Sequence, residues 1–188
     1  VITTPKGEKV IDFGQNLVGW VKLKANGKAG DKITVSHAEV LDKNGNFYTE
    51  NLRNAKAQAV YVLKGNGEEI FEPHFTFFGF RYIKVEGIAT ELQPENFTAV
   101  ALYSDMQQTG SFTSSDSLIN QLQHNIEWGL RGNFVDVPTD CPQRDERMGW
   151  TGDAQAFFRT ATLLRGVNNF FTKWMKDLAA DQTKTGSV

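Results

Sequence analysis

The chain has 188 residues, of which 40% are hydrophobic and 22% charged, and its 20 basic and 22 acidic side chains leave a net charge of −2. This composition is typical of a globular protein with one large domain or two small ones. The charge balance gives no electrostatic case for nucleic acid or an anionic membrane surface, and the single cysteine excludes an internal disulfide and a multi-cysteine zinc site. The apolar runs are too short for a helix that crosses a bilayer.

Short strand-like segments occupy the first hundred residues. Residues 19–25 and 81–85 alternate apolar and polar side chains, which is typical of strands with one buried face. Residues 42–46 are rich in Asp, Asn and Gly, which tolerate positive φ, and predict a hairpin turn. Several short strands separated by Gly and Asn predict an antiparallel β-sandwich over residues 1–105, not a βαβ fold. The other expected strands are 10–13, 32–36, 59–63 and 98–103.

The hydrophobic period becomes that of helices near residue 105. A first helix is expected after the capping residues 113–116, because four apolar side chains then recur at helical spacing. Two more helices are expected, one over residues 151–165, capped by its first residue, and one capped by residue 168. Residues 133–151 should be mostly loop, since they contain two prolines and a glycine. The apolar residues of the first helix are Leu118, Leu122, Ile126 and Leu130.

The helical part of the chain is short for the apolar surface that it carries. Three amphipathic helices need partners that about 75 residues do not obviously supply. The chain also begins at Val1 instead of an initiator methionine. We therefore expect a piece of a longer protein, with residues 106–188 forming the first part of a truncated helical domain.

The most polar stretch of the chain is residues 137–153, which hold four carboxylates, two arginines, a tryptophan and a glutamine. Two prolines and two glycines fix its path, and a loop between two helices can direct several side chains into one cleft. A solvated charged loop is the simpler interpretation, but it would not need such rigidity or Trp150 beside a glycine. Carboxylates and arginines suit sugar hydroxyl groups, and an aromatic ring suits the apolar face of a sugar.

This stretch carries a long motif. Asp140-Cys141-Pro142-Gln143-Arg144-Asp145-Glu146-Arg147, followed by Gly149-Trp150-Thr151-Gly152-Asp153, resembles the signature of the bacterial α-L-rhamnosidases of glycoside hydrolase family 78. Shorter segments that resemble the same family occur upstream in the family's order, so that the resemblance covers nearly the whole chain. They are residues 12–16, 37–41, 51–55 and 74–82.

The resemblance implies an α+β multidomain fragment. An antiparallel β-sandwich would occupy residues 1–105, and residues 106–188 would supply the first three or so helices of an (α/α)6 catalytic barrel. The family releases terminal α-L-rhamnose by an inverting mechanism, so a rhamnose-containing glycoside or polysaccharide would be the substrate. No metal, cofactor, membrane or nucleic acid is implied, and a secreted or periplasmic location is favoured, with a cytoplasmic one left open.

The resemblance also implies roles for five residues. Glu146 would be the general acid that protonates the leaving oxygen. Asp140, Arg144, Trp150 and Asp153 would bind the sugar. In the family the general base is a glutamate late in the barrel, so we expect it beyond the end of this chain and expect the 188 residues alone to be inactive.

Two alternatives stay open. The chain could belong to a non-catalytic carbohydrate-binding or structural module, or to a related hydrolase that acts on another deoxy-sugar or a uronide. An enzyme predicts that Asp140, Glu146 and Asp153 converge in one pocket, whereas a module predicts that they point into solvent.

Three other features are interpreted as structural. Cys141 has no histidine near it in sequence, so packing or a weak polar contact is expected. His37 and Glu39 have the H-x-E spacing of zinc deaminases, but the accompanying cysteine pair is missing. A group of phenylalanines is expected to pack in the core, with alternate members facing inward. These are Phe75, Phe77, Phe78 and Phe80.

Overall fold

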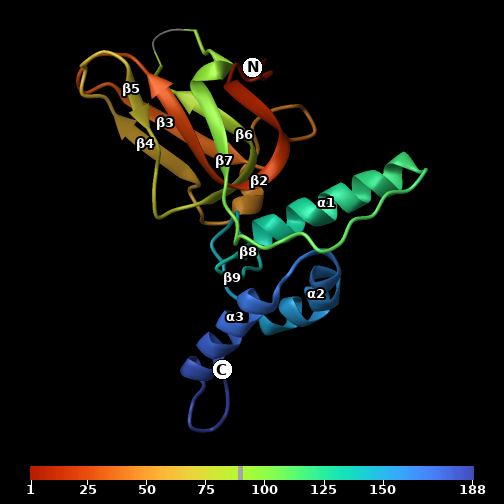
Figure 1. Cartoon of the computed structure of the whole chain (residues 1–188). Coiled ribbons are helices and arrows are strands. Elements are labelled where there is room, and N and C mark those ends of the chain that lie inside the picture. The colour runs from red at the N-terminus through yellow and green to blue at the C-terminus, as the bar shows by residue number, and fades with distance from the viewer. Residues whose placement is uncertain (89–90) are drawn as a thin grey trace. The chain divides into compact units, whose positions relative to one another are not determined.

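The computed structural model describes residues 1–88 and 91–188, which form two compact units. The sheet unit comprises Val1–Leu102 together with Cys141–Glu146. The helical unit comprises Tyr103–Asp140 together with Arg147–Val188. An antiparallel sheet followed by three helices confirms the predicted fold class (Figure 1).

The sheet of the first unit is antiparallel at every pairing between its named strands. Its order within the described residues is β1-β2-β6-β3-β4, and β5 and β7 pair with β2 outside this path. Two 3-10 helices, η1 (Glu50–Leu52) and η2 (Pro94–Asn96), lie between strands. The strands are β1 (Ile2–Thr3), β2 (Lys9–Ala25), β3 (Lys32–Ala38), β4 (Gln58–Val62), β5 (Glu69–Phe71), β6 (Phe78–Glu86) and β7 (Phe97–Ala101).

Strand β2 is longer than the sequence predicted. Two strands were expected on either side of Gly14, but one strand runs through the glycine, and its register with β6 shifts between Asp12 and Leu17. Gly14 has a φ of +76°, which a glycine adopts without strain and which suits a β-bulge. The length of β2 lets it pair with β1 and then β7 along one edge, and with β6 and then β5 along the other.

The other predictions for this unit are largely confirmed. Strands β3, β4, β6 and β7 occur where alternation or short apolar runs predicted them. The predicted turn over residues 42–46 is present, because the Asp42 carboxylate accepts bonds from the backbone N–H groups of Asn44 and Asn46, each at 2.8 Å. Strands β1 and β5 were not predicted, since two or three residues are too few to show a period.

The core of the sheet unit includes an aromatic cluster around His37. The His37 ring is 1% exposed, stacks on Phe78 with 4.0 Å between centroids, and meets the edge of Phe80 at 4.9 Å. Phe78 and Phe80 are therefore core residues, as predicted, whereas Phe75 is fully exposed and that part of the prediction is wrong.

His37 is neutral near pH 7. Burial lowers the pKa of His37 to about 4, although the carbonyl of Ala57, 2.8 Å from Nδ1, favours the protonated ring. A neutral ring packed between aromatic side chains supports the structural interpretation of this histidine.

The helical unit contains α1 (Ser117–Asn133), α2 (Thr151–Leu164) and α3 (Asn168–Asp181), with a short hairpin of β8 (Phe134–Val135) and β9 (Val137–Pro138) after α1. The three helices were predicted. Asp116 caps α1 itself, because its carboxylate accepts a bond from the N–H of Leu118 at 2.8 Å. Thr151 and Asn168, predicted as caps, are instead the first helical residues of α2 and α3.

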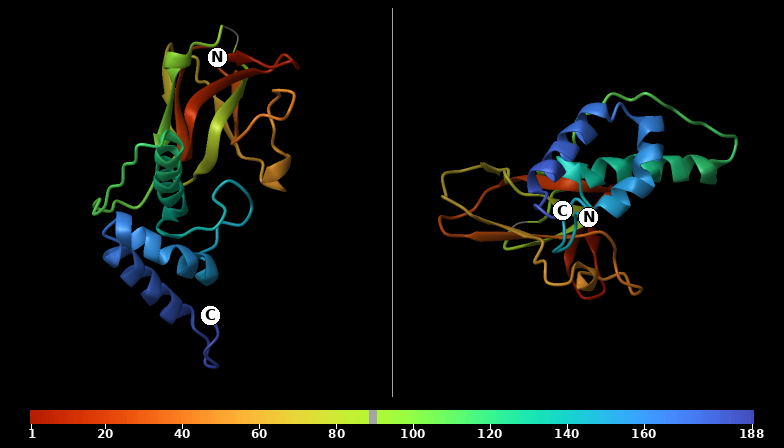
Figure 2. Two further views of the ribbon diagram at one scale, coloured as in Figure 1. Left: turned by 90° about the vertical axis from the view of Figure 1, so that its right-hand side faces the viewer. Right: turned by 90° about the horizontal axis from the view of Figure 1, so that it is seen from below.

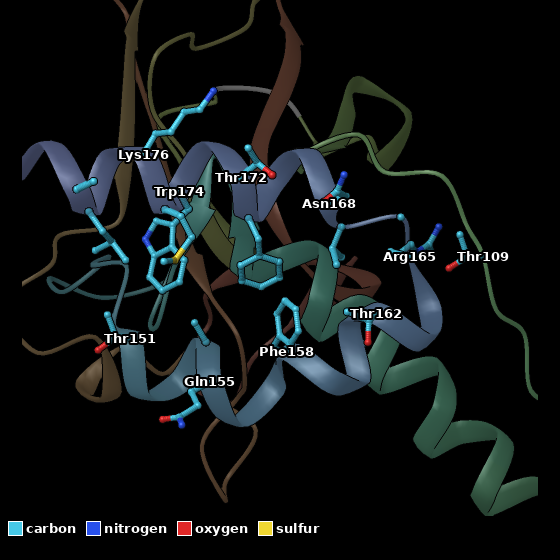
Figure 3. A pocket seen from close by; sticks show the side chains of 17 residues that line it. Thr109, Thr151, Gln155, Phe158, Thr162, Arg165, Asn168, Thr172, Trp174 and Lys176 are labelled. Carbon is cyan, nitrogen blue, oxygen red and sulfur yellow. The ribbon is translucent and has the colours of Figure 1, made fainter.

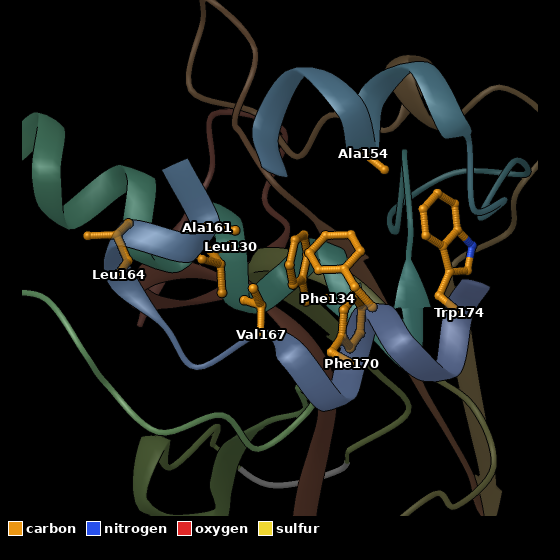
Figure 4. Close-up of a cluster of buried hydrophobic side chains, with 9 residues drawn as sticks. Leu130, Phe134, Ala154, Ala161, Leu164, Val167, Phe170 and Trp174 are labelled. Atoms are coloured by element: carbon orange, nitrogen blue, oxygen red, sulfur yellow. The ribbon is translucent and has the colours of Figure 1, made fainter. Parts of the chain in front are cut away.

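The core of the helical unit forms where the end of α1, the β8 strand, α2 and α3 meet (Figure 4). The Phe134 ring stacks on Phe170 with 4.6 Å between centroids and meets the edge of Phe171 at 5.6 Å. Helices α2 and α3 meet at the three-residue link 165–167 (Figure 2). The buried members of this core are Leu130, Phe134, Ala154, Ala161, Leu164, Val167, Phe170, Phe171 and Trp174.

Much apolar surface of the helices remains open. Leu118 and Leu122 on α1 are 78% and 57% exposed, so that only the C-terminal end of the predicted apolar face is buried. A hollow of about 1120 Å³ lies between α2 and α3, and side chains including Phe158 and Trp174 line it (Figure 3). Within the described part of the chain, no helix combines the length and the hydropathy needed to cross a membrane.

Candidate active site

The polar loop of residues 137–153 leaves the helical unit after Asp140 and returns to it at Arg147. Asp140 ties the two ends of this loop together: its N–H donates to the carbonyl of Met148 at 3.0 Å, and its Oδ1 accepts from the N–H of Met148 at 2.8 Å. The side chain of Asn133, the last residue of α1, donates to the carbonyl of Asp140 at 2.8 Å. These bonds fix the base of the loop to the end of α1.

A pocket of about 320 Å³ in the helical unit has Asp140 and Asp153 in its lining. Its remaining wall is largely apolar and includes Leu130, Phe134 and Phe157. Asp153 lies in the first turn of α2, where the helix dipole stabilises a negative charge. The structure therefore brings two of the predicted sugar-binding carboxylates to one concave, partly apolar surface, which is the usual character of a small-molecule site.

Trp150 immediately precedes α2 and is 51% exposed. Its carbonyl accepts a bond from the N–H of Ala154 at 3.2 Å, so its backbone is fixed by the start of the helix. Among the described residues, Trp150 does not line the pocket that contains Asp140 and Asp153. The ring presents a partly exposed aromatic face next to the loop.

Glu146 is held within the sheet unit, where its side chain is 27% exposed. Its Oε2 accepts bonds from Arg144, at 2.9 Å from Nη2 and 3.2 Å from Nε. The same oxygen accepts a bond from Nη1 of Arg53 at 3.1 Å. The structure thus brings Glu146 and Arg144 together, as two members of the predicted site, and adds a second guanidinium group.

Arg144 and Cys141 are also neighbours. Burial lowers the pKa of Arg144, but the adjacent Cys141 and Glu146 outweigh this and raise it. Cys141 makes a polar contact with Arg144, which is one of the two alternatives expected for it, and within the described residues it has no disulfide partner. The arrangement is one of a permanently charged arginine beside a carboxylate.

Three contributors to this arrangement were missed in the sequence: Arg53, Gly79 and Asn133. Arg53 lies in a segment, 51–55, that resembled the family but suggested no role. Its contact with Glu146 joins residues that are 93 positions apart, and no local sequence pattern predicts a contact over that distance. Gly79 in β6 accommodates Gln143, since a Cβ at Gly79 would lie only 2.6 Å from the Cβ of Gln143.

Comparisons with known proteins agree for both parts of the chain. The model of the bacterial α-L-rhamnosidase concanavalin-like domain matches residues 2–103, and that of the bacterial α-L-rhamnosidase six-hairpin glycosidase domain matches residues 107–188. An α-L-rhamnosidase of Streptomyces avermitilis is 46% identical over 187 residues, which are 99% of this chain and 18% of that protein. One from Formosa agariphila is 45% identical over 95% of this chain and 20% of its own length.

Solved structures give the same result. The crystal structure of the Streptomyces avermitilis α-L-rhamnosidase complexed with L-rhamnose matches 93% of this chain and 17% of that chain, with 46% identity and a TM-score of 0.90. The α-L-rhamnosidase of Aspergillus terreus matches 96% of this chain and 21% of that chain, with 46% identity and a TM-score of 0.92. The chain spans about a fifth of the length of these relatives. It belongs to the bacterial α-L-rhamnosidase family.

Proposed function

We propose that the protein containing this chain is a glycoside hydrolase that releases terminal α-L-rhamnose by an inverting mechanism, with Glu146 as the general acid. The proposal rests chiefly on the motif of residues 140–153, which presents Asp140 and Asp153 at one pocket and Glu146 beside Arg144. The relatives that share this chain are named α-L-rhamnosidases, and one of them is solved with L-rhamnose bound.

The hydrogen bonds of Glu146 suggest which of its oxygens carries the proton. Among the described residues, the bonds from Arg144 and Arg53 both end on Oε2. A protonated carboxyl group can keep accepting these bonds at its carbonyl oxygen while the other oxygen carries the hydrogen. We therefore assign Oε2 to the arginines and Oε1 to proton donation toward the glycosidic oxygen.

An inverting reaction also needs a general base on the opposite face of the sugar. In such enzymes the two carboxyl groups stand about 6.5–9.5 Å apart, which leaves room for the attacking water. We propose that the base comes from a part of the protein outside these 188 residues, and that the 188 residues by themselves do not turn over rhamnosides.

The chemistry of the proposed sugar-binding residues supports the roles that the resemblance implies. The carboxylates of Asp140 and Asp153 accept hydrogen bonds from ring hydroxyl groups, and Arg144 donates to them. The half-exposed ring of Trp150 packs against an apolar face of the sugar, such as the one that carries the methyl group of a 6-deoxyhexose. The apolar wall around Asp140 and Asp153 suits the same kind of ligand.

The proposal also concerns the part of the protein that lies outside these 188 residues, which would pack against the helices. We propose that residues 1–105 form one domain, and that 106–188 are part of a larger helical domain whose further helices cover the open apolar surface. Exposed side chains such as Leu118 and Leu163, at 78% and 66%, and the hollow between α2 and α3 support this division.

A non-catalytic carbohydrate-binding module is the competing interpretation. It predicts that the acids of the loop point into solvent, whereas Asp140 and Asp153 contribute to the lining of one pocket. Glu146, the third acid expected there, is not among the described residues that line this pocket. A hydrolase for another deoxy-sugar or a uronide would use the same acid chemistry. Only the response to different glycosides separates that possibility from a rhamnosidase.

The proposed reaction is tested by the stereochemistry of its first product. The full-length protein should hydrolyse an aryl α-L-rhamnoside, and proton NMR in the first minutes should show β-L-rhamnose before mutarotation sets in. The matching aryl α-L-fucoside and aryl β-D-glucuronide serve as controls and should be poor substrates. First release of α-L-rhamnose, or equal rates on all three glycosides, would contradict the proposal.

A further inference from the structure

The segment that carries Glu146 is part of the sheet unit. Residues Cys141–Glu146 cluster with Val1–Leu102, although they are separated from these residues along the chain by the first part of the helical unit. Two contacts with the sheet unit hold the segment, one at Glu146 itself and one at Gln143. The sheet unit therefore supplies the immediate support of the proposed general acid.

The first contact comes from Arg53, which follows the 3-10 helix η1. Leu52 is fully buried, and its carbonyl accepts a bond from the N–H of Ala55 at 3.1 Å, so the backbone on both sides of Arg53 is anchored. Arg53 itself has a φ of +55°, in the left-handed region that non-glycine residues seldom adopt. This anchored backbone directs the guanidinium group to Oε2 of Glu146.

The second contact is made by Gly79, which pairs with Val18 in the sheet. A Cβ at this position would lie 2.6 Å from the Cβ of Gln143, 3.1 Å from its Cα and 3.2 Å from its backbone nitrogen. Only a hydrogen atom fits in that space. The segment 141–146 therefore approaches strand β6 closely at Gly79.

We propose that Arg53 is a positioning residue for Glu146, and that Gly79 of β6 supports the segment that carries this glutamate. This inference rests on the proposed function of Glu146. Arg144 is two residues from Glu146 on the same loop, so its bonds to Oε2 are local ones. Arg53 ties the same oxygen to an anchored part of the sheet unit and so fixes the direction of Oε1.

The contribution of Arg53 to stability should be small. Its side chain is 54% exposed, and exposed ion pairs contribute little because water screens them and the side chains lose entropy. Its expected effect is therefore on the orientation of the acid. Small displacements of a catalytic group can reduce a rate by about 100-fold.

The test compares substrates that need the acid with substrates that do not. In the full-length protein, Arg53→Met removes the charge and keeps the side-chain length, Arg53→Lys keeps the charge, and Lys56→Met is a control in the same segment. Lys56 is exposed, and within the described residues the structure gives it no contact with Glu146. Each variant is assayed on a phenyl and on a 2,4-dinitrophenyl α-L-rhamnoside, since a good leaving group needs little protonation.

For Arg53→Met we expect kcat on the phenyl rhamnoside to fall about 10- to 100-fold, with KM within about twofold and little loss on the dinitrophenyl substrate. Arg53→Lys should recover part of the rate, and Lys56→Met should behave as wild type. Equal losses on both substrates, a change in KM alone, or no loss would overturn the inference. Melting temperatures within a few degrees of wild type show that each variant is folded.

Gly79 provides a second and independent variant. Gly79→Ala should also lower kcat selectively on the phenyl substrate, because its methyl group displaces Gln143. Adding Gln143→Gly removes the closest atom of that clash and should restore part of the rate. A Gly79→Ala variant with wild-type kcat on both substrates, or a double variant that is no better than the single one, would contradict the role of β6.

The outcome of Glu146→Gln separates this inference from the proposed function. If Glu146→Gln keeps normal activity on the phenyl substrate, the proposed acid is wrong, and the inference about Arg53 fails with it. If Glu146→Gln loses that activity while Arg53→Met matches Lys56→Met, the acid stands and only the positioning role is wrong.

Discussion

His37 shows at the scale of one residue how burial in an aromatic cluster makes stability depend on pH. Its pKa is about 4 in the folded protein, against 6.5 for an ordinary histidine. Between these pH values the unfolded chain binds a proton at His37 that the folded chain does not bind. The contribution of His37 to the free energy of unfolding is therefore fully present above pH 6.5 and is lost as the pH drops toward 4. The difference corresponds to about 3 kcal/mol.

We therefore predict that the free energy of unfolding in urea falls by about 3 kcal/mol between pH 7 and pH 4 through His37 alone. In His37→Gln this component of the pH dependence should disappear, since the amide does not titrate. His124→Gln, at an exposed position of α1, serves as the control substitution. An unchanged slope in His37→Gln would show that His37 is not the group responsible.

The residues of the candidate site were partly predictable. The residue types of the 140–153 loop indicated a sugar-binding cleft, whereas the roles of its members came from the resemblance of the motif to the α-L-rhamnosidases; those members are Asp140, Arg144, Glu146, Trp150 and Asp153. The partners of these residues were not predictable. Arg53 reaches Glu146 only because the chain has folded, and a glycine in a strand gives no sign that Gln143 will rest on it.

At the scale of elements, the start of α1 depends on one side chain. The Asp116 carboxylate accepts a bond from the N–H of Leu118, and Ser114 and Asn120 exchange two further bonds across the helix start, each at 2.8 Å. The unpaired N–H groups of a first turn need such acceptors, and the negative charge of Asp116 also interacts favourably with the positive end of the helix dipole.

Asp116→Ala should lower the free energy of unfolding in urea by about 1 kcal/mol, because a helix cap of this kind is lost. Ser115→Ala is the matched control, since the adjacent Ser115 is exposed and makes no side-chain hydrogen bond within the described residues. A loss of equal size in both variants, or none in Asp116→Ala, would contradict the capping role.

The strands and helices themselves were more predictable than their boundaries. Alternation, short apolar runs and helical spacing predicted β3, β4, β6, β7 and the three helices, because apolar residues recur in them at the period of a strand or a helix. Gly14 was misread as a break because a glycine in a strand signals either an end or a bulge. Thr151 and Asn168 have the chemistry of caps but lie one position inside their helices, which is within the usual uncertainty of a helix boundary.

At the scale of the molecule, the chain consists of two units, and the sheet unit includes the segment Cys141–Glu146 that interrupts the helical unit in sequence. The loop that leaves the helical unit carries Glu146 into the sheet unit and returns at Arg147. The proposed general acid therefore belongs to the sheet unit, whereas Asp140 and Asp153 belong to the helical unit. The proposed mechanism depends throughout on Glu146 donating the proton to the glycosidic oxygen.

That claim is tested most directly by Glu146→Gln in the full-length protein, with Glu95→Gln, an exposed glutamate of η2, as the control. The account predicts that kcat on the phenyl α-L-rhamnoside falls by about 100-fold or more, because general acid catalysis is lost, while the dinitrophenyl substrate is affected far less. A Glu146→Gln protein with near-normal kcat on the phenyl substrate would contradict it.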